Sequence, residues 1–366
     1  MKSLWKICLF AYYFLNLHHK EAKMQYEVTI GIPVYRAVDY IKKTMESALC
    51  QTFSSIEFLV LNDCGEDGSM AIVEQFQTSH PRGKDIRIIH HSHNCGVGIS
   101  RNRILDEAKG RYLYFLDSDD LIEPNTIELM VKAALQSDAQ VVYGSWEKVD
   151  NVDHSPTQQH PYPSLEFVES DMLATYAFKN YSSFWISVCN CLMDTSFLKA
   201  THLRFLDTVF WEDLAFTYEL VTKVTRAVLL PEITYHYLCR PGSLSHYQDR
   251  DELQKDEILR NVSTIDHLKR MCRSLRGRSF LPYLCYNLEV SSFYIVCYVL
   301  KHSKRIYPSV SNKELLLFMK FPLPLREVAY FRGKWIENLL LYVMSKMPAG
   351  LFVGLVKAIG KVKRVI

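Results

Sequence analysis

Between residues 26 and 143, short apolar runs alternate with stretches of helical periodicity, and this alternation constrains the fold more than any other feature of the sequence. The apolar runs predict strands at residues 28–33, 57–61, 86–90, 112–116 and 140–143. The stretches between them predict helices at residues 38–49, 68–77, 97–109 and 125–137. Strands that alternate with helices form a mostly parallel sheet, in which ligands bind beyond the carboxyl ends of the strands. We therefore predict an α/β, Rossmann-like fold whose functional residues follow strands.

The chain has 366 residues, which is more than one compact core usually holds, so we expect a second region beyond the sheet. Helical patterns run from residue 249 to the end, whereas residues 151–163 are rich in His, Pro, Gln and Ser and predict a loop. We divide the chain into an N-terminal extension (1–25), an α/β domain (26–248) and a helical C-terminal region (249–366).

The charge balance gives no reason to expect a nucleic acid as partner, because 43 Lys and Arg residues face 40 Asp and Glu residues. The ten cysteines lack the paired CxxC spacing of a zinc site, and we expect reduced thiols in the cytoplasm. Cys189 and Cys191 are two residues apart, which favours two side chains on one face of a strand over a pair of metal ligands.

The first residues of the chain allow three interpretations. Residues 4–17 are apolar behind Lys2, as in a signal peptide, but no small-residue cleavage site follows. The stretch is also shorter than the ~20 residues that a spanning helix needs. We favour Met24 as the true start, since a strand begins almost at once, with an interfacial anchor as the second choice.

An acidic turn follows the predicted strand at 112–116. Its sequence is Asp117, Ser118, Asp119, Asp120, and three neighbouring carboxylates repel one another unless a cation or several hydrogen-bond donors are present. A hard divalent ion that holds a nucleoside diphosphate suits such oxygen ligands. The alternative is an acidic turn that caps the next helix, and the position of the turn after a buried strand favours the metal site.

Several motifs in the order in which they occur resemble glycosyltransferase family 2, whose members have the GT-A nucleotide-diphospho-sugar transferase fold. The resemblance runs from residue 28 to about residue 245 and rests on the sequences at 32–35, 51–53, 62–63, 94–102 and 117–119. It divides the α/β domain into a donor half (26–150) and an acceptor half (151–248). Two positions depart from the family pattern, Arg36 where Asn is frequent and Cys64 where Gly is frequent, and both leave the base preference open.

The resemblance implies specific roles in the donor half. Pro33, Tyr35 and Asp63 would line the pocket for uracil or another base, with Asp63 accepting a hydrogen bond from the base. Asp117 would hold the ribose or the metal, and Asp119 would ligate Mn²⁺ or Mg²⁺ bridging the two phosphates. We also expect Arg101, near the start of a helix, to face the phosphates or ribose of the donor, the alternative being a solvated helix charge.

A second acidic pair, Glu212 and Asp213, opens a predicted helix in the acceptor half. Inverting glycosyl transfer needs a base that takes the proton of the acceptor hydroxyl as its oxygen attacks the anomeric carbon. The resemblance places this pair at the acceptor face, and we assign Asp213 as the base and Glu212 as a helper for acceptor hydroxyls. The alternative is an acidic pair that the helix macrodipole favours at a helix start.

A basic loop after residue 239 resembles the family segment that closes over the donor. Arg240 and Ser243 are the residues that would clamp the diphosphate there. His236 or His246 could complete the metal shell, although a lone histidine is more often structural.

The last residues, 348–366, combine an apolar stripe with four basic residues. Such a helix is typical of peripheral attachment to an anionic membrane, here the cytoplasmic face of the cell membrane, and docking on the protein itself is the alternative.

The leading hypothesis is an inverting, metal-dependent glycosyltransferase that moves a sugar from a nucleotide donor, a UDP-sugar by our expectation, to a hydroxyl of a saccharide or lipid-linked glycan, as in cell-surface polysaccharide synthesis. One alternative is a sugar nucleotidyltransferase, although the Gly-rich phosphate loop expected after the first strand is missing from residues 33–35. Another is an inactive nucleotide-sugar-binding partner of a second transferase.

Overall fold

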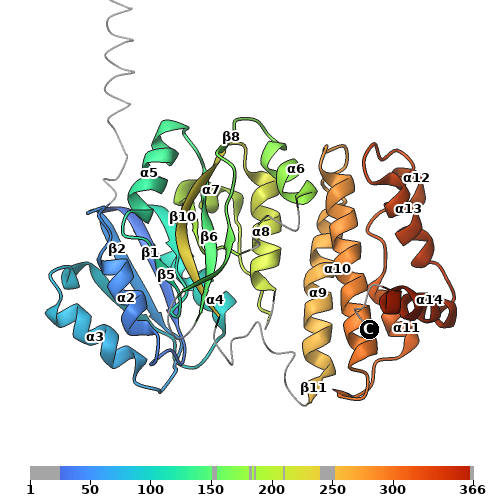
Figure 1. Ribbon diagram of the computed structural model, residues 1–366, viewed down its shortest axis with the longest axis horizontal. Coiled ribbons are helices and arrows are strands. Elements are labelled where there is room, and N and C mark those ends of the chain that lie inside the picture. Colours follow the sequence, from blue (N-terminus) through green and yellow to red (C-terminus); the bar gives the residue numbers. More distant parts are fainter. Residues whose placement is uncertain are drawn as a thin grey trace, which may run out of the picture.

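The computed structural model describes residues 25–150, 155–180, 184, 187–208, 211–239 and 252–362. A twisted sheet with flanking helices forms one side of the molecule, and a group of helices forms the other (Figure 1). Helix α8 (Glu212–Lys223) belongs to the first side and lies between the sheet and the helical group. All three interpretations of the N-terminal segment fall on residues outside this described part.

The sheet has the strand order β3-β2-β1-β4-β9-β6-β10-β5, with β7 beside β6 and β8 beside β10. Its strands are β1 (Tyr26–Val34), β2 (Ile56–Asn62), β3 (Ile86–His90), β4 (Gly110–Phe115), β5 (Leu121–Ile122), β6 (Val141–Asp150), β7 (Pro156–His160), β8 (Leu165–Phe167), β9 (Cys191–Asp194) and β10 (Ala227–Cys239). Strands β3, β2, β1 and β4 are parallel to one another, and so are β6 and β10.

The predicted α/β class with a helix-flanked sheet is confirmed, but the sheet is mixed. Strand β9 lies antiparallel between β4 and β6, and the short strands β5, β7 and β8 also pair antiparallel. The predicted loop at 151–163 is wrong over β7, because the polar residues of this segment pair with β6 at the edge of the sheet. An edge strand has one side open to solvent, so it needs no apolar pattern.

The helices around the sheet are α2 (Ile41–Leu49), α3 (Ser69–Ser79), the 3₁₀ turn η1 (Gly83–Asp85), α4 (Val97–Glu107), α5 (Thr126–Gln136), α6 (Met172–Lys179), α7 (Thr195–Thr201) and α8 (Glu212–Lys223). Strands β1 and β2 are buried over most of their length, as expected of central strands with helices on both faces. This burial fixes the positions of the polar residues that follow these strands.

The helical part consists of α9 (Lys255–Met271), α10 (Leu281–Lys301), α11 (Asn312–Phe318), α12 (Leu325–Val328), α13 (Trp335–Met344) and α14 (Ala349–Val362), with the short parallel pair β11 (Leu253–Gln254) and β12 (Ile306–Tyr307). Helix α9 packs on α8, and α10 packs on α6. Asn287 of α10 donates a hydrogen bond of 2.9 Å to the carbonyl oxygen of Phe178, which joins the two parts. Helix α10 is long and apolar enough to cross a membrane, yet most of it is buried within the protein, as in a core helix.

Part of the apolar side of α14 is packed inside the protein, whereas Leu351 is exposed. Phe352, Val353 and Val356 are buried, and the helix contacts α10 and α11. The sequence allowed either membrane attachment or docking on the protein for this helix, and these three residues of α14 are docked on the protein. Residues 363–366 lie outside the described part.

A buried ion pair lies inside the helical part. Lys269 Nζ is 2.7 Å from Glu289 Oε1 and also donates a hydrogen bond of 3.0 Å to the carbonyl oxygen of Phe318. Burial raises the pKa of Glu289 to about 7, while the Lys269 cation opposes this rise. The pair joins α9 to α10, and each of the two buried charges would be left without a counter-ion if the other were removed.

We predict that Lys269→Met destabilises the protein by about 3–5 kcal/mol at neutral pH, because it leaves the Glu289 carboxylate buried without a cation. The loss should shrink toward about pH 5, since the folded state then holds Glu289 protonated at little cost relative to the unfolded chain. Urea unfolding at the two pH values measures both effects. The double variant Lys269→Met/Glu289→Met should recover most of the stability, and equal losses in the single and double variants would contradict the prediction.

Candidate active site

Polar residues from four segments meet at the carboxyl ends of β1, β2 and β4. Pro33 is buried within β1, and Tyr35, just beyond its end, is exposed with the Arg36 guanidinium 5.2 Å from the centre of its ring. Asp63 follows β2, and its backbone N–H donates to the carbonyl oxygen of Val34 at 2.9 Å. These residues thus lie at the carboxyl edge of the parallel strands, where the strand pattern predicts that a ligand binds.

Asp63 is buried, and its carboxylate holds the loop before α4. The backbone N–H groups of Cys95 and Gly96 donate to its two oxygens, each at 2.9 Å. His91 Nδ1 lies 2.8 Å from Oδ1, and the Asn94 side-chain amide donates to Oδ2 at 3.2 Å. A carboxylate has about four lone-pair positions, so these four donors occupy its accepting capacity. Asp63 therefore shapes this loop, and its predicted hydrogen bond from the base, which stays a prediction, requires one of these four partners to be displaced.

Several non-glycine residues near this edge have left-handed backbone. Arg36 has φ 49°, Cys64 has φ 60°, and Trp211, directly before Glu212, has φ 66°. Asn and Gly tolerate this conformation better than most residues, which explains why the resembling family often has them at the positions of Arg36 and Cys64. The backbone geometry is kept at some cost in strain, as is common at functional sites.

The acidic turn after β4 divides into two kinds of carboxylate. Asp120 is buried and accepts hydrogen bonds from Tyr235 Oη at 2.6 Å and from the backbone N–H of Leu238 at 2.7 Å. Burial, and then the charges of Asp119 and Asp117, raise the pKa of Asp120 well above its usual range. Asp120 thus anchors the turn to β10, whereas Asp117 and Asp119 are partly exposed.

Arg101 of α4 is almost completely buried and connects three carboxylates. Its Nη2 donates to Asp117 Oδ1 at 2.8 Å, and its Nη1 donates to Glu212 Oε1 at 3.0 Å and to Asp213 Oδ1. The solvated helix charge that was the alternative for this residue does not describe it, because its side chain is 3% exposed. A role for Arg101 toward the donor stays a prediction.

Asp213 lies at the centre of this cluster with both oxygens held. Arg101 contacts Oδ1, and Ser187 Oγ donates to Oδ2 at 3.2 Å. Burial raises the pKa of Asp213 to about 7, which the Arg101 cation opposes and the Glu212 charge reinforces. Burial likewise raises the pKa of Glu212. A carboxyl with a pKa near 7 can act as a base at neutral pH.

Glycines bring α4 close enough to α8 for these contacts. A Cβ on Gly98 would lie 2.7 Å from the carbonyl oxygen of Leu206 and 3.5 Å from Glu212 Cβ. Gly96, which precedes α4, has φ 87°. Asn102, one residue after Arg101, exchanges two hydrogen bonds of 2.9 Å with the backbone of Phe205. The sequence motif around Arg101 therefore positions one helix against the other.

His236 of β10 is engaged at both ring nitrogens. Nδ1 lies 2.9 Å from Glu147 Oε1, and Nε2 lies 2.9 Å from Glu123 Oε1. Neither nitrogen is left for a metal ion in this arrangement. Arg240, Ser243 and His246 lie outside the described residues, and their predicted roles stay predictions.

Two residues of this site carry no signal in the sequence. Ser187 holds Asp213, and Tyr235 holds Asp120, but an isolated serine in an irregular segment and a tyrosine in a strand carry no spacing signal. Cys189 and Cys191 are buried free thiols, and only Cys191 lies in strand β9, while Cys189 precedes it in an isolated bridge to Phe115. All nine cysteines in the described segments are free.

Comparison with known proteins identifies the sheet-containing part of the chain. The sequence profile of "Glycosyl transferase family 2" matches residues 29–200. Residues 29–200 therefore form a glycosyl transferase family 2 domain.

Curated relatives of this family member differ in how much of their length they share with it. The succinoglycan biosynthesis protein ExoO of Rhizobium meliloti is 28% identical over 273 residues, which cover 69% of this chain and 74% of ExoO. The E. coli glucosyltransferase WfaP, named UDP-Glc:alpha-D-GlcNAc-diphosphoundecaprenol beta-1,3-glucosyltransferase, is 27% identical over 67% of this chain and 90% of WfaP. The uncharacterized E. coli K12 glycosyltransferase YibD is 32% identical, but the chain spans only 32% of its length.

Solved structures share the fold with this family 2 chain. Residues 1–349 of TarS from S. aureus, in complex with UDP-GlcNAc, align with a TM-score of 0.62 at 19% identity, covering 87% of this chain and 90% of that chain. The mannosyltransferase PcManGT from Pyrobaculum calidifontis, in complex with GDP-Man and Mn²⁺, aligns with a TM-score of 0.51 at 13% identity, covering 93% and 95%. The predicted GT-A fold with a helical C-terminal region is therefore confirmed.

We predict that Asp63→Asn loosens the loop that the carboxylate holds, because an amide cannot accept from all four donors. Hydrogen exchange at the Cys95 and Gly96 amides should quicken about tenfold or more, the usual effect of losing a hydrogen bond to a charged acceptor. Mass spectrometry of a peptide that covers residues 91–98 measures this exchange. Asp39→Asn, at an exposed position, is the matched control, and equal exchange in both variants would contradict the anchoring role.

Proposed function

We propose that this protein is an inverting, metal-dependent glycosyltransferase that moves a sugar from a nucleoside-diphosphate donor to a hydroxyl of a saccharide or lipid-linked glycan. The observation that carries the proposal is the contact of one buried guanidinium, Arg101, with Asp117 on one side and with Glu212 and Asp213 on the other. Asp117 belongs to the predicted donor site and the other two to the predicted acceptor site. One cluster thus holds both sets of groups that glycosyl transfer needs.

The donor side fits a divalent cation. Asp117 and Asp119 are the partly exposed carboxylates of the acidic turn, and carboxylate oxygens are the ligands that Mg²⁺ and Mn²⁺ accept in proteins. Asp120 is buried and accepts from Tyr235 and Leu238, so we propose the two partly exposed carboxylates, Asp117 and Asp119, as the ligands of the ion. When bound, such an ion neutralises charge that develops on the departing diphosphate. Tyr35 and Pro33 lie at the same edge of the sheet and would contact the base.

The acceptor side supplies the base. An acceptor hydroxyl attacks the anomeric carbon, the bond from this carbon to the phosphate oxygen breaks, and Asp213 takes the hydroxyl proton. Attack opposite the leaving diphosphate inverts the configuration. Ser187 and Arg101 hold the two Asp213 oxygens in place, and Glu212 would orient acceptor hydroxyls. A pKa of about 7 suits a base that must accept and then release a proton near neutral pH.

The relatives support the class of donor and acceptor. WfaP is named for a UDP-sugar donor and a diphosphoundecaprenol-linked acceptor, and the TarS complex contains UDP-GlcNAc. We therefore propose a UDP-sugar donor and an acceptor in cell-surface polysaccharide synthesis, at the cytoplasmic face of the membrane. Residues 26–150 would bind the donor, and 151–248 would bind the acceptor. Arg240 and Ser243 would close over the diphosphate.

We predict that turnover needs a divalent ion held mainly by Asp119. Asp119→Ala should lower nucleoside diphosphate release by a factor of 100 or more by our order-of-magnitude estimate (about 3 kcal/mol), because charge on the leaving group is then not neutralised. Release from a panel of nucleotide sugars, with Mn²⁺ and with EDTA, is the measurement. Glu66→Ala, in a neighbouring loop, is a control that should keep its activity. Full activity of Asp119→Ala in EDTA would disprove the metal role.

We predict that Asp213→Asn lowers turnover about 100-fold to 10,000-fold while the affinity for nucleoside diphosphate changes little. Turnover of the unaltered protein should rise with pH through about 7, because the carboxyl of Asp213 acts as a base only when ionised. Calorimetry with nucleoside diphosphate and Mn²⁺, together with a pH–rate profile, tests both parts.

The variant should also lose the rise of turnover near pH 7. A fall in donor affinity as large as the fall in rate would instead assign Asp213 to the donor site.

A further inference from the structure

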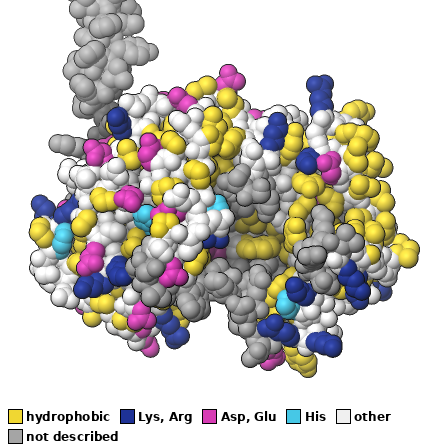
Figure 2. Space-filling model, viewed as in Figure 1, with side chains coloured by type: hydrophobic (Ala, Val, Ile, Leu, Met, Phe, Trp, Pro, Cys, Tyr) yellow, Lys and Arg dark blue, Asp and Glu magenta, His cyan; other side chains and the backbone are white. Residues whose placement is uncertain are grey.

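One side of α13 exposes large apolar side chains. Trp335, Ile336, Leu340 and Val343 are exposed, and at about 100° per residue they fall within about 140° of the helix circumference. We refer to these four residues as the α13 face. Leu340 is 60% exposed. Figure 2 shows hydrophobic side chains gathered along the side of the molecule that α12, α13 and α14 form.

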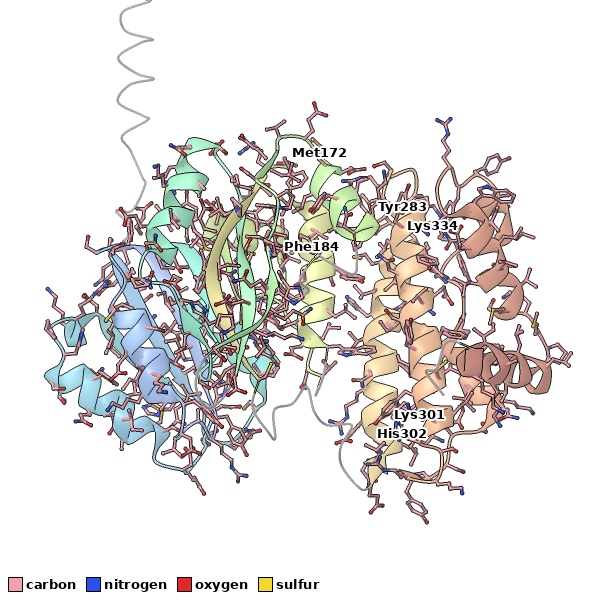
Figure 3. All side chains as sticks on the ribbon, in the orientation of Figure 1. Met172, Phe184, Tyr283, Lys301, His302 and Lys334 are labelled. Atoms are coloured by element: carbon pink, nitrogen blue, oxygen red, sulfur yellow. The ribbon has the colours of Figure 1, made fainter. Side chains whose placement is uncertain are left out.

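The rest of the helical part leaves this face uncovered. The opposite side of α13 is packed, since Asn338 is buried and donates to the carbonyl oxygen of Pro282 in α10 at 2.9 Å. Lys334 directly precedes α13, and its Nζ lies 4.6 Å from the centre of the Tyr286 ring of α10. Figure 3 shows Lys334 beside Tyr283, which also belongs to α10. Helix α13 is thus fixed in one orientation with the α13 face turned outward. Contiguous exposed apolar surface of this kind marks an interaction site.

The segment of the chain that contains α13 is strongly basic. Residues 301–362 contain eleven Lys and Arg residues and three Glu, with no Asp. Each of these glutamates already has a basic partner: Glu314 pairs with Lys255 at 2.7 Å, Glu327 with Arg276 at 2.7 Å, and Glu337 with Lys334 at 3.0 Å. Within the described part of the chain, no carboxylate pairs with the exposed cations Arg326, Arg332, Lys357 and Lys361.

We propose that the α13 face docks on an anionic lipid surface, with α13 lying in the interface. A tryptophan and aliphatic residues beside unpaired cations are the composition of helices that bind there. A second copy of the chain is disfavoured as the occupant, because two such basic surfaces would repel one another. The ten residues of α13 are too few to span a bilayer, so the contact is peripheral. The proposal assigns the membrane contact expected of α14 to α13, since Phe352, Val353 and Val356 of α14 are buried and, among its described side chains, Leu351 alone is an exposed large apolar residue.

Vesicle sedimentation of the full chain tests this proposal, with phosphatidylcholine vesicles that contain or lack phosphatidylglycerol. The protein should pellet with the anionic vesicles and be released by salt. Leu340→Glu should weaken partitioning about tenfold or more, since it removes an apolar side chain that the lipid would bury and adds a negative charge. Arg332→Glu should weaken it about fivefold or more. Leu135→Glu and Lys132→Glu, both on the exposed side of α5, are matched controls that should pellet as the unaltered protein does.

Three outcomes would overturn the proposal. These are failure of the protein to pellet with anionic vesicles, equal losses in the α13 and α5 variants, and sedimentation velocity showing a dimer that Leu340→Glu dissociates. Circular dichroism of each variant checks that it is folded. Sedimentation measures lipid binding and not catalysis. A protein without the proposed transferase activity would therefore still pellet, so the lipid-docking proposal and the proposed transferase function can fail independently.

Discussion

The buried guanidinium of Arg101 is the interaction on which the site depends. A cation that is taken out of water needs several oxygen partners, and here Asp117, Glu212 and Asp213 supply them. These residues come from segments that are far apart in the sequence and belong to the end of β4 and the start of α8. The same cation limits the mutual repulsion of the carboxylates and opposes the rise in the pKa of Asp213. The acidic residues can therefore stay close together only because α4 brings Arg101 between them.

Much of this arrangement follows from sequence pattern, because the strands are short, buried and regularly spaced. The ends of β1, β2 and β4 had to lie on one edge of the sheet, and so did the acidic residues that follow them. Pairing along the sheet was not predictable in the same way. Strand β9 lies antiparallel between β4 and β6, far along the chain from both. Strand β7 is a polar edge strand, which the sequence does not mark because backbone pairing at an edge needs no apolar pattern.

The division of labour among the carboxylates also needed the structure. Asp117, Asp119 and Asp120 are alike in sequence, and only the position of Tyr235 on β10 shows that Asp120 turns inward. Arg101 looks like an exposed helix residue until α8 is placed beside it. The C-terminal helices carry the same lesson, since both α13 and α14 are apolar by composition. Which of them covers the core depends on packing against α10 and α11, and that is a property of the tertiary structure.

Helix α8 begins with Glu212 and Asp213, and along its length it is the surface on which α9 packs. Glu219 Oε1, two turns into α8, lies 2.6 Å from His267 Nε2 of α9. One rigid rod thus carries the acidic pair at its tip and the helical part on its flank. A change that repacks this flank against α9 would therefore also shift the acidic pair at the start of the same helix.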